Sequence, residues 1–163
     1  MMLRSFRLIF GVFLLFGFTT CSNPPSEFDV FLDVEGDQWA YSDLKEILWN
    51  CADTTSSYDI FLNIRHQGNY EWQNIYLKVQ VIDPEGKERV YLKSVALSNA
   101  EGYWVGKGLG DWKVASPLLL PRMQFKKLGL YRMRLEQHMR VDPLEGVGQV
   151  GLKMVKRPAQ SKN

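Results

Sequence analysis

The feature that most restricts the fold of this chain is an alternation of apolar and polar side chains with a period of two. It runs through residues 58–65, 75–82, 89–97, 131–140 and 150–154. Successive side chains of a β-strand point to opposite faces of a sheet, so this pattern is typical of strands with one buried face. Strands of this length and spacing predict an all-β single domain, an antiparallel β-sandwich of roughly seven to eight strands, immunoglobulin-like or jelly-roll-like.

Two of these segments, 75–82 and 89–97, are expected to form a hairpin. The residues between them include Asp-Pro-Glu-Gly at 83–86, with Pro at the second position of a type I turn. The alternation slips by one residue in the second strand, which predicts a β-bulge near residues 93–94. Residues 42–50 are expected to form a turn or two of helix, because Leu44, Ile47 and Leu48 share a helical face.

Composition excludes several classes of function. The chain has 163 residues, with 20 Lys and Arg, 18 Asp and Glu, two His and two Cys. A net charge of +2 gives no basis for nucleic-acid binding through bulk positive charge. Two cysteines cannot form a four-cysteine zinc site, and two histidines leave little material for a metalloenzyme. We therefore expect a globular protein without a metal, a cofactor or a nucleic-acid partner.

The N-terminus has the layout of a secretory signal peptide. Arg4 and Arg7 precede an uncharged apolar run at 8–18, and no acidic residue occurs before Glu27. A membrane-spanning helix needs about 20 apolar residues, so this run is short for an anchor. Cys21 closes the segment with small residues just before it, which suggests a bacterial lipoprotein cleaved before an acylated cysteine, although Thr20 stands where Gly or Ala is more usual.

The expected organisation follows from that cleavage. Residues 1–20 are a lipoprotein signal peptide, 21–27 a lipidated tether, 28–157 the β-sandwich domain and 158–163 a flexible tail. Acyl chains on Cys21, palmitate among them, would hold the protein at a membrane. The alternative is that Cys21 is an ordinary residue after a conventional cleavage.

The second cysteine, Cys51, is expected to be a buried free thiol when Cys21 is lipidated. The alternative, a reactive nucleophile, needs a base beside it, and neither His66 nor His138 lies in a recognisable motif with it. If Cys21 is unmodified, a Cys21–Cys51 disulfide becomes possible instead.

Charge is distributed unevenly along the chain. Residues 22–111 contain 7 basic and 15 acidic side chains, whereas residues 112–163 contain 11 basic and 3 acidic ones. The favoured interpretation is that acidic and basic strands pair within one sheet. The other is an electrically polar domain that docks a partner or faces lipid headgroups.

Motifs that would carry chemistry are weak. The glycine-rich segment 106–111 has Asp111 where a G-x-G-x-x-G dinucleotide fingerprint needs its last glycine, and it lacks the Gly-Lys-Ser/Thr ending of a P-loop. Its glycines are expected to fix a tight loop or to admit another backbone. The acids at 29–37 do not have the spacing of a calcium loop, and a solvated acidic edge is favoured. Glu136 and Asp142 could be drawn as a catalytic pair, but no nucleophile or metalloprotease motif accompanies them.

Aromatic residues offer a second function. Five tryptophans and seven tyrosines occur, and most are expected in the core. Trp72 lies in a polar stretch and is the best candidate for an exposed contact, such as a sugar-binding platform.

Three segments together resemble the gliding-motility lipoprotein family GldH. Residues 58–65, Tyr-Asp-Ile-Phe-Leu-Asn-Ile-Arg, are similar to a strand of that family. Residues 104–111 resemble its Trp-x-Gly-x-Gly-x-Gly-Asp loop, with the motif positions at Trp104, Gly106, Gly108, Gly110 and Asp111. Residues 136–144 resemble its Glu-Gln-x-Met-Arg-x-Asp-x-Leu segment, and this corner contributes Glu136, Arg140 and Asp142. The resemblance covers roughly residues 20–156.

The resemblance implies a non-enzymatic cell-envelope lipoprotein. Its expected role is an accessory or assembly component of gliding-motility and type IX secretion-associated machinery, acting by docking other envelope proteins. It supplies no catalytic residues, so the loop and the corner receive structural or docking roles. Arg140 and Asp142 are close enough in sequence to pair around a turn.

The expected location is the outer membrane, anchored through the lipid on Cys21. The residues directly after Cys21 lack an acidic cluster that would favour surface export, which points to the periplasmic face. The alternative function is a surface lipoprotein that binds glycans through exposed aromatic side chains.

Overall fold

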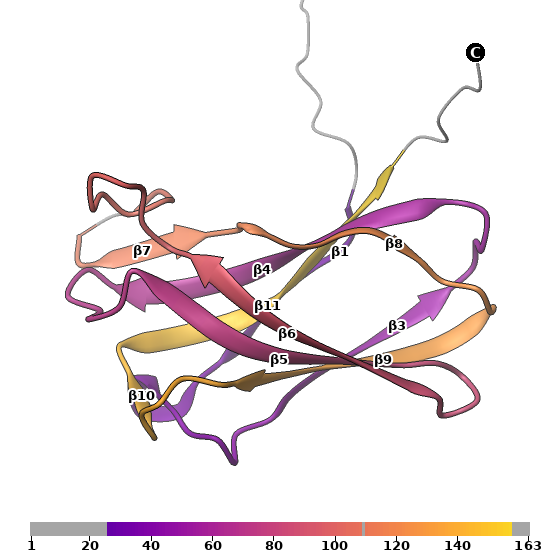
Figure 1. The fold of residues 1–163 in the computed structure, drawn as a ribbon, viewed down its shortest axis with the longest axis horizontal. Helices are drawn as coiled ribbons and strands as arrows, with labels where there is room; N and C mark the ends of the chain where they lie inside the picture. Colours follow the sequence, from indigo (N-terminus) through magenta and orange to yellow (C-terminus); the bar gives the residue numbers. More distant parts are fainter. Residues whose placement is uncertain (1–25, 109, 158–163) are drawn as a thin grey trace, which may run out of the picture.

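A computed structural model of the chain describes residues 26–108 and 110–157. It is an antiparallel β-sandwich whose two main sheets face each other (Figure 1). The first sheet has the strand order β1-β11-β4-β7, and β8 also pairs with β4. Its strands are β1 (Ser26–Asp33), β11 (Val147–Arg157), β4 (Ser57–Gln67), β7 (Trp112–Ala115) and β8 (Leu118–Gln124).

The second sheet has four strands in the order β3-β9-β5-β6. They are β3 (Lys45–Cys51), β9 (Gly129–Gln137), β5 (Asn74–Ile82) and β6 (Glu88–Ala96). A short ladder joins β2 (Gln38–Trp39) to β10 (Leu144–Glu145), and a single 3-10 turn, η1 (Glu35–Asp37), precedes it. The predicted all-β sandwich is confirmed, with more strands than the sequence indicated.

The core lies between the two main sheets. Strand β4 supplies Tyr58, Ile60, Leu62 and Ile64, all at most 1% exposed, and β9 and β5 face them with their own alternating apolar side chains. Each fully buried side chain of this size contributes about 1.5–3 kcal/mol of transfer free energy. Within the described residues, no helix is long and apolar enough to cross a membrane.

The helical turn expected at 42–50 is wrong. Residues 45–51 form β3, which pairs with β9 over its whole length. Ile47, Trp49 and Cys51 point into the core, whereas Leu44 and Leu48 are exposed. The period of two therefore decides this segment, because a partner strand was available to bury that face.

The hairpin of β5 and β6 is confirmed, and its turn is closed by a hydrogen bond from the Gly86 amide to the Asp83 carbonyl, 2.9 Å long. The predicted bulge near residues 93–94 is wrong, since the register runs without a break from Asn74 to Ile82. The apparent slip arises because Val90 and Leu92 point outward and are 51% and 64% exposed.

The uneven charge along the chain is explained by pairing within the sheets. Acidic residues of the first half meet basic residues of β9 and β11, as the favoured interpretation predicted. The ion pairs are Glu46 with Arg132 and Arg134, Asp29 with Lys153, Asp53 with Lys156, and Asp59 with Arg157. Most of these side chains are partly solvated, so screening by water weakens the pairs.

The sandwich has two ends with different contents. We call one the tether end; it comprises the first residue of β1, the β3–β4 loop (52–56), the β5–β6 turn (83–87) and the β8–β9 loop (125–128). We call the other the motif end; it comprises the segments 34–44, 68–73, 97–108, 110–111 and 138–146. Figure 1 shows the β5–β6 hairpin and the β8–β9 loop at one end, and β10 with the loops around β7 at the other.

Candidate functional site

The two motif segments meet at the motif end, on either side of the β4–β5 loop (68–73). On one side, the Gly68 amide donates a hydrogen bond of 2.5 Å to the Asp111 carbonyl. On the other side, the Gln67 amide donates a hydrogen bond of 2.8 Å to the carbonyl of Gly146, two residues after the corner segment 136–144. Asp111 and Gly146, which are 35 residues apart in sequence, thus frame one short loop.

The glycine-rich segment folds back alongside β7, and the two are joined by a short antiparallel bridge. Lys107 and Val114 exchange two backbone hydrogen bonds, 2.8 and 3.0 Å long. A Cβ atom on Gly108 would lie 1.9 Å from the Trp112 carbonyl oxygen, and one on Gly106 would lie 2.4 Å from that of Val114. These glycines therefore admit a close backbone approach, as the sequence predicted, rather than cradling a phosphate.

Trp104 connects the glycine-rich segment to the β4–β5 loop. Its indole N–H donates to the Gly68 carbonyl at 3.0 Å. Its ring stands edge-on to the His66 imidazole, with 4.7 Å between centroids, and Tyr70 lies beside both. Such edge-to-face pairs add about 0.5–1.5 kcal/mol to the burial of the rings.

His66 is the buried polar centre of this cluster. Its side chain is 0% exposed, and its Nδ1 lies 2.8 Å from the Gln67 carbonyl. Its Nε2 has no hydrogen-bond partner among the described residues. Burial away from water lowers the pKa of His66 below its usual value, because a charged imidazole would lose its hydration. The His66 ring is therefore neutral near pH 7. Burial also favours the neutral form of Tyr70, because it raises the pKa of that phenol.

The corner at 138–143 is held by Gln137, which is 0% exposed. Its amide nitrogen donates to the Val141 carbonyl at 3.0 Å, and its oxygen accepts from the Met139 amide at 2.9 Å. Tyr41 closes the corner from outside, since its hydroxyl donates to the Met139 carbonyl and its amide donates to the Asp142 carboxylate at 2.9 Å. The buried Gln137 amide thus provides hydrogen-bond partners for two backbone groups of the turn.

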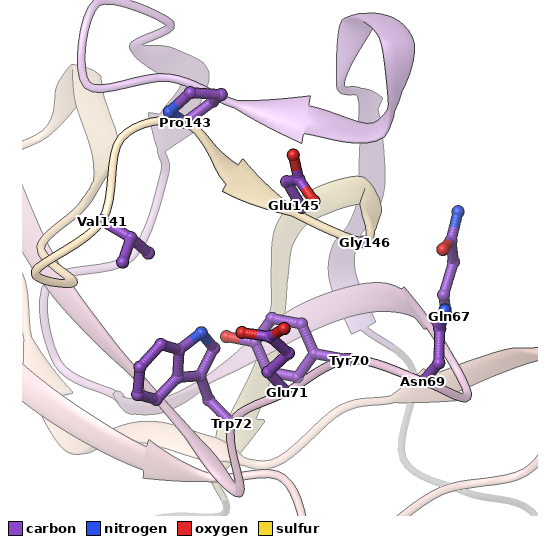
Figure 2. A pocket seen from close by; sticks show the side chains of 9 residues that line it. All are labelled: Gln67, Asn69, Tyr70, Glu71, Trp72, Val141, Pro143, Glu145 and Gly146. Carbon is purple, nitrogen blue, oxygen red and sulfur yellow. The ribbon is translucent and has the colours of Figure 1, made fainter.

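Between the corner and the β4–β5 loop lies a pocket of about 330 Å³. Figure 2 shows Trp72, Glu71 and Tyr70 along one side and Val141, Pro143 and Glu145 along the other. Trp72 also borders a second hollow of about 400 Å³, which is lined by Tyr76, His138, Met139 and Arg140. Trp72 is 38% exposed, so the structure places the predicted aromatic contact between two open hollows.

A profile of the GldH lipoprotein family matches residues 27–154, which span the whole sandwich. The chain belongs to the GldH lipoprotein family. It is 25% identical to "Gliding motility lipoprotein GldH homolog" of Christiangramia forsetii, over 95% of this chain and 98% of that one. It is 28% identical to "Gliding motility lipoprotein GldH" of Flavobacterium johnsoniae, over 78% of this chain and 82% of that one. No solved structure matches it.

The structure separates the corner residues that the sequence grouped together. Glu136 lies on β9 and forms an ion pair with Lys78 of β5 at 3.0 Å. Asp142 accepts from the Tyr41 amide, and among the described residues Arg140 takes part in no ion pair. The expected Arg140–Asp142 pair is therefore absent from the described region, and Glu136 and Asp142 are engaged with different partners.

The loop residues of the GldH motif are brought together as the sequence grouped them. Trp104, Gly106, Gly108 and Asp111 all contact the β4–β5 loop or β7. Gly110 has a φ of 65° and open space around it, so its role is the turn itself. Cys21 lies outside the described residues, as do the signal peptide and most of the tether.

Three residues that organise this site were not selected from the sequence: His66, Tyr70 and Gln137. Gln137 stands inside the quoted motif and on the apolar face of β9, and a polar residue at an inward position was the signal for it. His66 continues the inward series of β4 in the same way. Nothing in the local sequence of Tyr70 indicates that it contacts Trp104.

Other groups able to do chemistry are dispersed. Cys51 is 1% exposed at the tether end, and burial raises the pKa of its thiol, which disfavours the thiolate. Among the described residues no three His, Cys, Asp or Glu side chains are grouped so that they could hold a metal ion. Asp29 and Asp33 of the acidic segment instead accept hydrogen bonds from Asn63 and Gln149.

Proposed function

We propose that this protein is a non-enzymatic envelope lipoprotein that docks other envelope proteins of a gliding-motility or type IX secretion-associated machine, as an accessory or assembly component. It is anchored through acyl chains on Cys21 in the outer membrane and faces the periplasm. Two acyl chains give stable attachment, and confinement to the membrane surface raises the effective concentration for a partner.

The observation that carries this proposal is the position of the motif segments relative to the chain entry. The first described residue, Ser26, pairs with Val155 beside the start of β4, whereas the motif segments lie beyond its end at Gln67. Strand β4 has 11 residues, which corresponds to about 36 Å. A protein tethered before Ser26 therefore presents the motif end away from its anchor.

The exposed side chains of the motif end suit a protein contact. Tyr103 is 73% exposed and Tyr41 42%, and Trp72 and Val105 are also exposed in loops of the motif end. Tyrosine and tryptophan are enriched at protein interfaces because they offer large contact area with few rotatable bonds. The hydrogen bonds that link the loops hold this surface in one shape before a partner binds.

The test is co-purification from detergent-solubilised membranes with the full-length protein. We expect Tyr103→Ala combined with Trp72→Ala to lose the co-purifying envelope proteins. Leu92→Ala is the matched control, because Leu92 is 64% exposed on the outer face of β6. Retention of the same partners by the motif-end variant, or their equal loss in the control, contradicts docking by the motif end.

The anchor has its own test, the intact mass and membrane partition of the protein from its host. A mature species that begins at Cys21 and carries acyl mass, lost in Cys21→Ala, supports the anchor. A water-soluble protein with an unmodified Cys21 refutes it.

The second candidate function, glycan binding, is favoured by one observation, the position of Trp72 between two open hollows. Aromatic faces bordering a hollow provide the stacking surface that sugar rings need. A glycan array with the full-length protein and with Trp72→Ala tests it. Binding that disappears in the variant would support this function, and an array without binding would reject it.

A further inference from the structure

The tether end carries a compact surface of its own, formed by the β5–β6 turn and the β8–β9 loop. The Lys127 ammonium lies 2.6 Å from the carboxylates of both Asp83 and Glu85. Gly129 packs against the Pro84 ring, so closely that a Cβ atom there would lie 3.2 Å from it. These contacts fix the loop to the turn as one unit.

Three cations remain available on this unit. Lys87, Arg89 and Lys126 line a hollow of about 220 Å³ together with Asp83, Lys127 and Tyr131. None of the three forms an ion pair within residues 26–108 and 110–157, whereas Lys127 already neutralises Asp83. Other acids of this end are also engaged: Asp53 with Lys156, Asp59 with Arg157 and Glu85 with Lys127. Glu27 and Glu88 are exposed acids nearby, and the Glu88 carboxylate accepts a hydrogen bond from Gln80.

Apolar side chains project beside these cations. Leu128 follows Lys126 and Lys127 at the tip of the loop and is 64% exposed. Leu130 and Leu48, 53% and 55% exposed, are diagonal neighbours on the outer face of β9 and β3. Exposed leucines next to lysines are typical of surfaces that rest in the headgroup layer of a membrane.

The chain enters the sandwich close to this unit. Ser26 of β1 shares a rung of the sheet with residues of β11, β4 and β8, and Met123 of β8 lies two residues before the β8–β9 loop. Three strand spacings separate Ser26 from Met123, which is about 14 Å. The five residues from Cys21 to Ser26 span at most about 18 Å. Acyl chains on Cys21 would therefore enter a bilayer within reach of the loop.

We propose that the tether end of the sandwich lies against the bilayer, with Lys87, Arg89 and Lys126 on anionic phospholipid headgroups and Leu128 in the interfacial layer. The inference rests on the proposed anchor at Cys21 and goes beyond it, because the folded domain itself recognises the membrane surface. The motif end then points away from the bilayer in a fixed orientation rather than at the end of a free tether.

The experiment places a fluorophore at each end of the acylated, full-length protein. Leu128→Cys is labelled at the tether end and Val105→Cys at the motif end, while the buried Cys51 stays unlabelled in the native protein. Each is reconstituted into vesicles of phosphatidylcholine, with or without phosphatidylglycerol and with a quencher in the bilayer. We expect strong quenching at Leu128 in the anionic vesicles, weaker quenching in the neutral ones, and none above background at Val105.

Charge reversal tests the headgroup contact. Each cation near an anionic surface is worth about fivefold in binding, so Arg89→Glu with Lys126→Glu should lower the ratio of docked to undocked protein by at least about 25-fold. Lys107→Glu, an exposed lysine of the motif end, is the matched control and should change nothing. Arg89→Gln with Lys126→Gln is the milder variant should the reversal impair folding.

Three results would decide against or between the proposals. Equal quenching at Leu128 and Val105 overturns the inference and leaves the anchor intact, and so does quenching that ignores headgroup charge. A protein without acyl mass counts against the anchor instead. In that case co-sedimentation of the unacylated full-length chain with anionic vesicles tests the tether end alone: binding lost on charge reversal supports the inference, and no binding overturns it.

Discussion

The two ends of the sandwich both contain an aromatic cluster, but the clusters are built in different ways. The tether end has four rings in edge-to-face or tilted contact, 4.8–6.1 Å apart, all at most 8% exposed: Trp49, Tyr58, Phe125 and Tyr131. At the motif end a half-buried Trp104 covers a buried imidazole, and hydrogen bonds between loops complete the structure.

This difference shows which kind of interaction stabilises each end. The tether end is closed by buried apolar area, which depends on volume and tolerates many loop sequences around it. The motif end is closed by backbone contacts between distant segments and by single buried polar groups, which depend on particular residues. The expected effects of substitution therefore differ in size and in kind.

The largest effect is expected at the tether end. Phe125→Ala removes a ring that is 0% exposed and contacts three other rings, so it should destabilise the protein by about 4 kcal/mol. Trp104→Ala, at the half-buried site, should cost about 2 kcal/mol. Urea unfolding followed by far-UV circular dichroism measures both. A larger loss for Trp104→Ala would reverse the assignment of the two ends.

The glycine-rich segment of the motif end should be the next most sensitive to substitution. Gly108→Ala sets a methyl group 1.9 Å from the Trp112 carbonyl oxygen and should cost about 3 kcal/mol through displacement of the backbone. Gly110→Ala has open space and only a positive φ against it, which costs about 1 kcal/mol. The midpoints of urea unfolding of the two variants give the comparison. Equal losses of stability would show that backbone conformation, and not the close approach to Trp112, is what requires glycine in this segment.

The corner offers a pair of adjacent residues with opposite burial. Gln137→Ala leaves the Val141 carbonyl and the Met139 amide without their partner and should cost about 2 kcal/mol. Glu136→Gln weakens a half-exposed ion pair with Lys78 and should cost about 0.5 kcal/mol or less. Thermal unfolding of both variants ranks them. The opposite ranking would show that the ion pair on the outer face of β9 contributes more to stability than the hydrogen bonds of the corner.

The most gradual effect is a dependence on pH that differs between the ends. His66 has a lowered pKa when folded, so the unfolded chain binds the proton more readily and stability falls as the pH drops below 6.5. One such group contributes at most about 1.4 kcal/mol per pH unit. At the tether end, hydrogen bonds from Lys156, Thr55 and Ser56 lower the pKa of Asp53, whose contribution is lost only below pH 3.8.

Urea unfolding between pH 7 and pH 5 separates the two groups. His66→Phe should remove the decline in that range, because the substituted ring takes up no proton, whereas Asp53→Asn should leave it in place. A decline that persists in His66→Phe would assign it to another group.

Much of the fold was predictable from local alternation. The strand at 58–65 and the hairpin closed at 83–86 are confirmed, because the side-chain period reports which face of a segment is buried. The strand expected at 131–140 is confirmed only as far as Gln137, since residues 138–140 form the corner. Exposed apolar residues obscured that signal at 42–50 and in β6, where they imitate a helix and a bulge although both strands alternate with a period of two. An exposed leucine cannot be distinguished from a buried one by its sequence position alone.

By itself, the sequence determined the all-β class, the pairing of acidic with basic strands and the resemblance to the GldH family. Tertiary structure alone decided that the two motif segments meet across the β4–β5 loop, that His66 and Gln137 are buried, and that the motif segments lie at the end opposite the chain entry. The physical reason is that a strand pattern specifies a face but not a neighbour. Which segments become neighbours depends on the packing of the whole core.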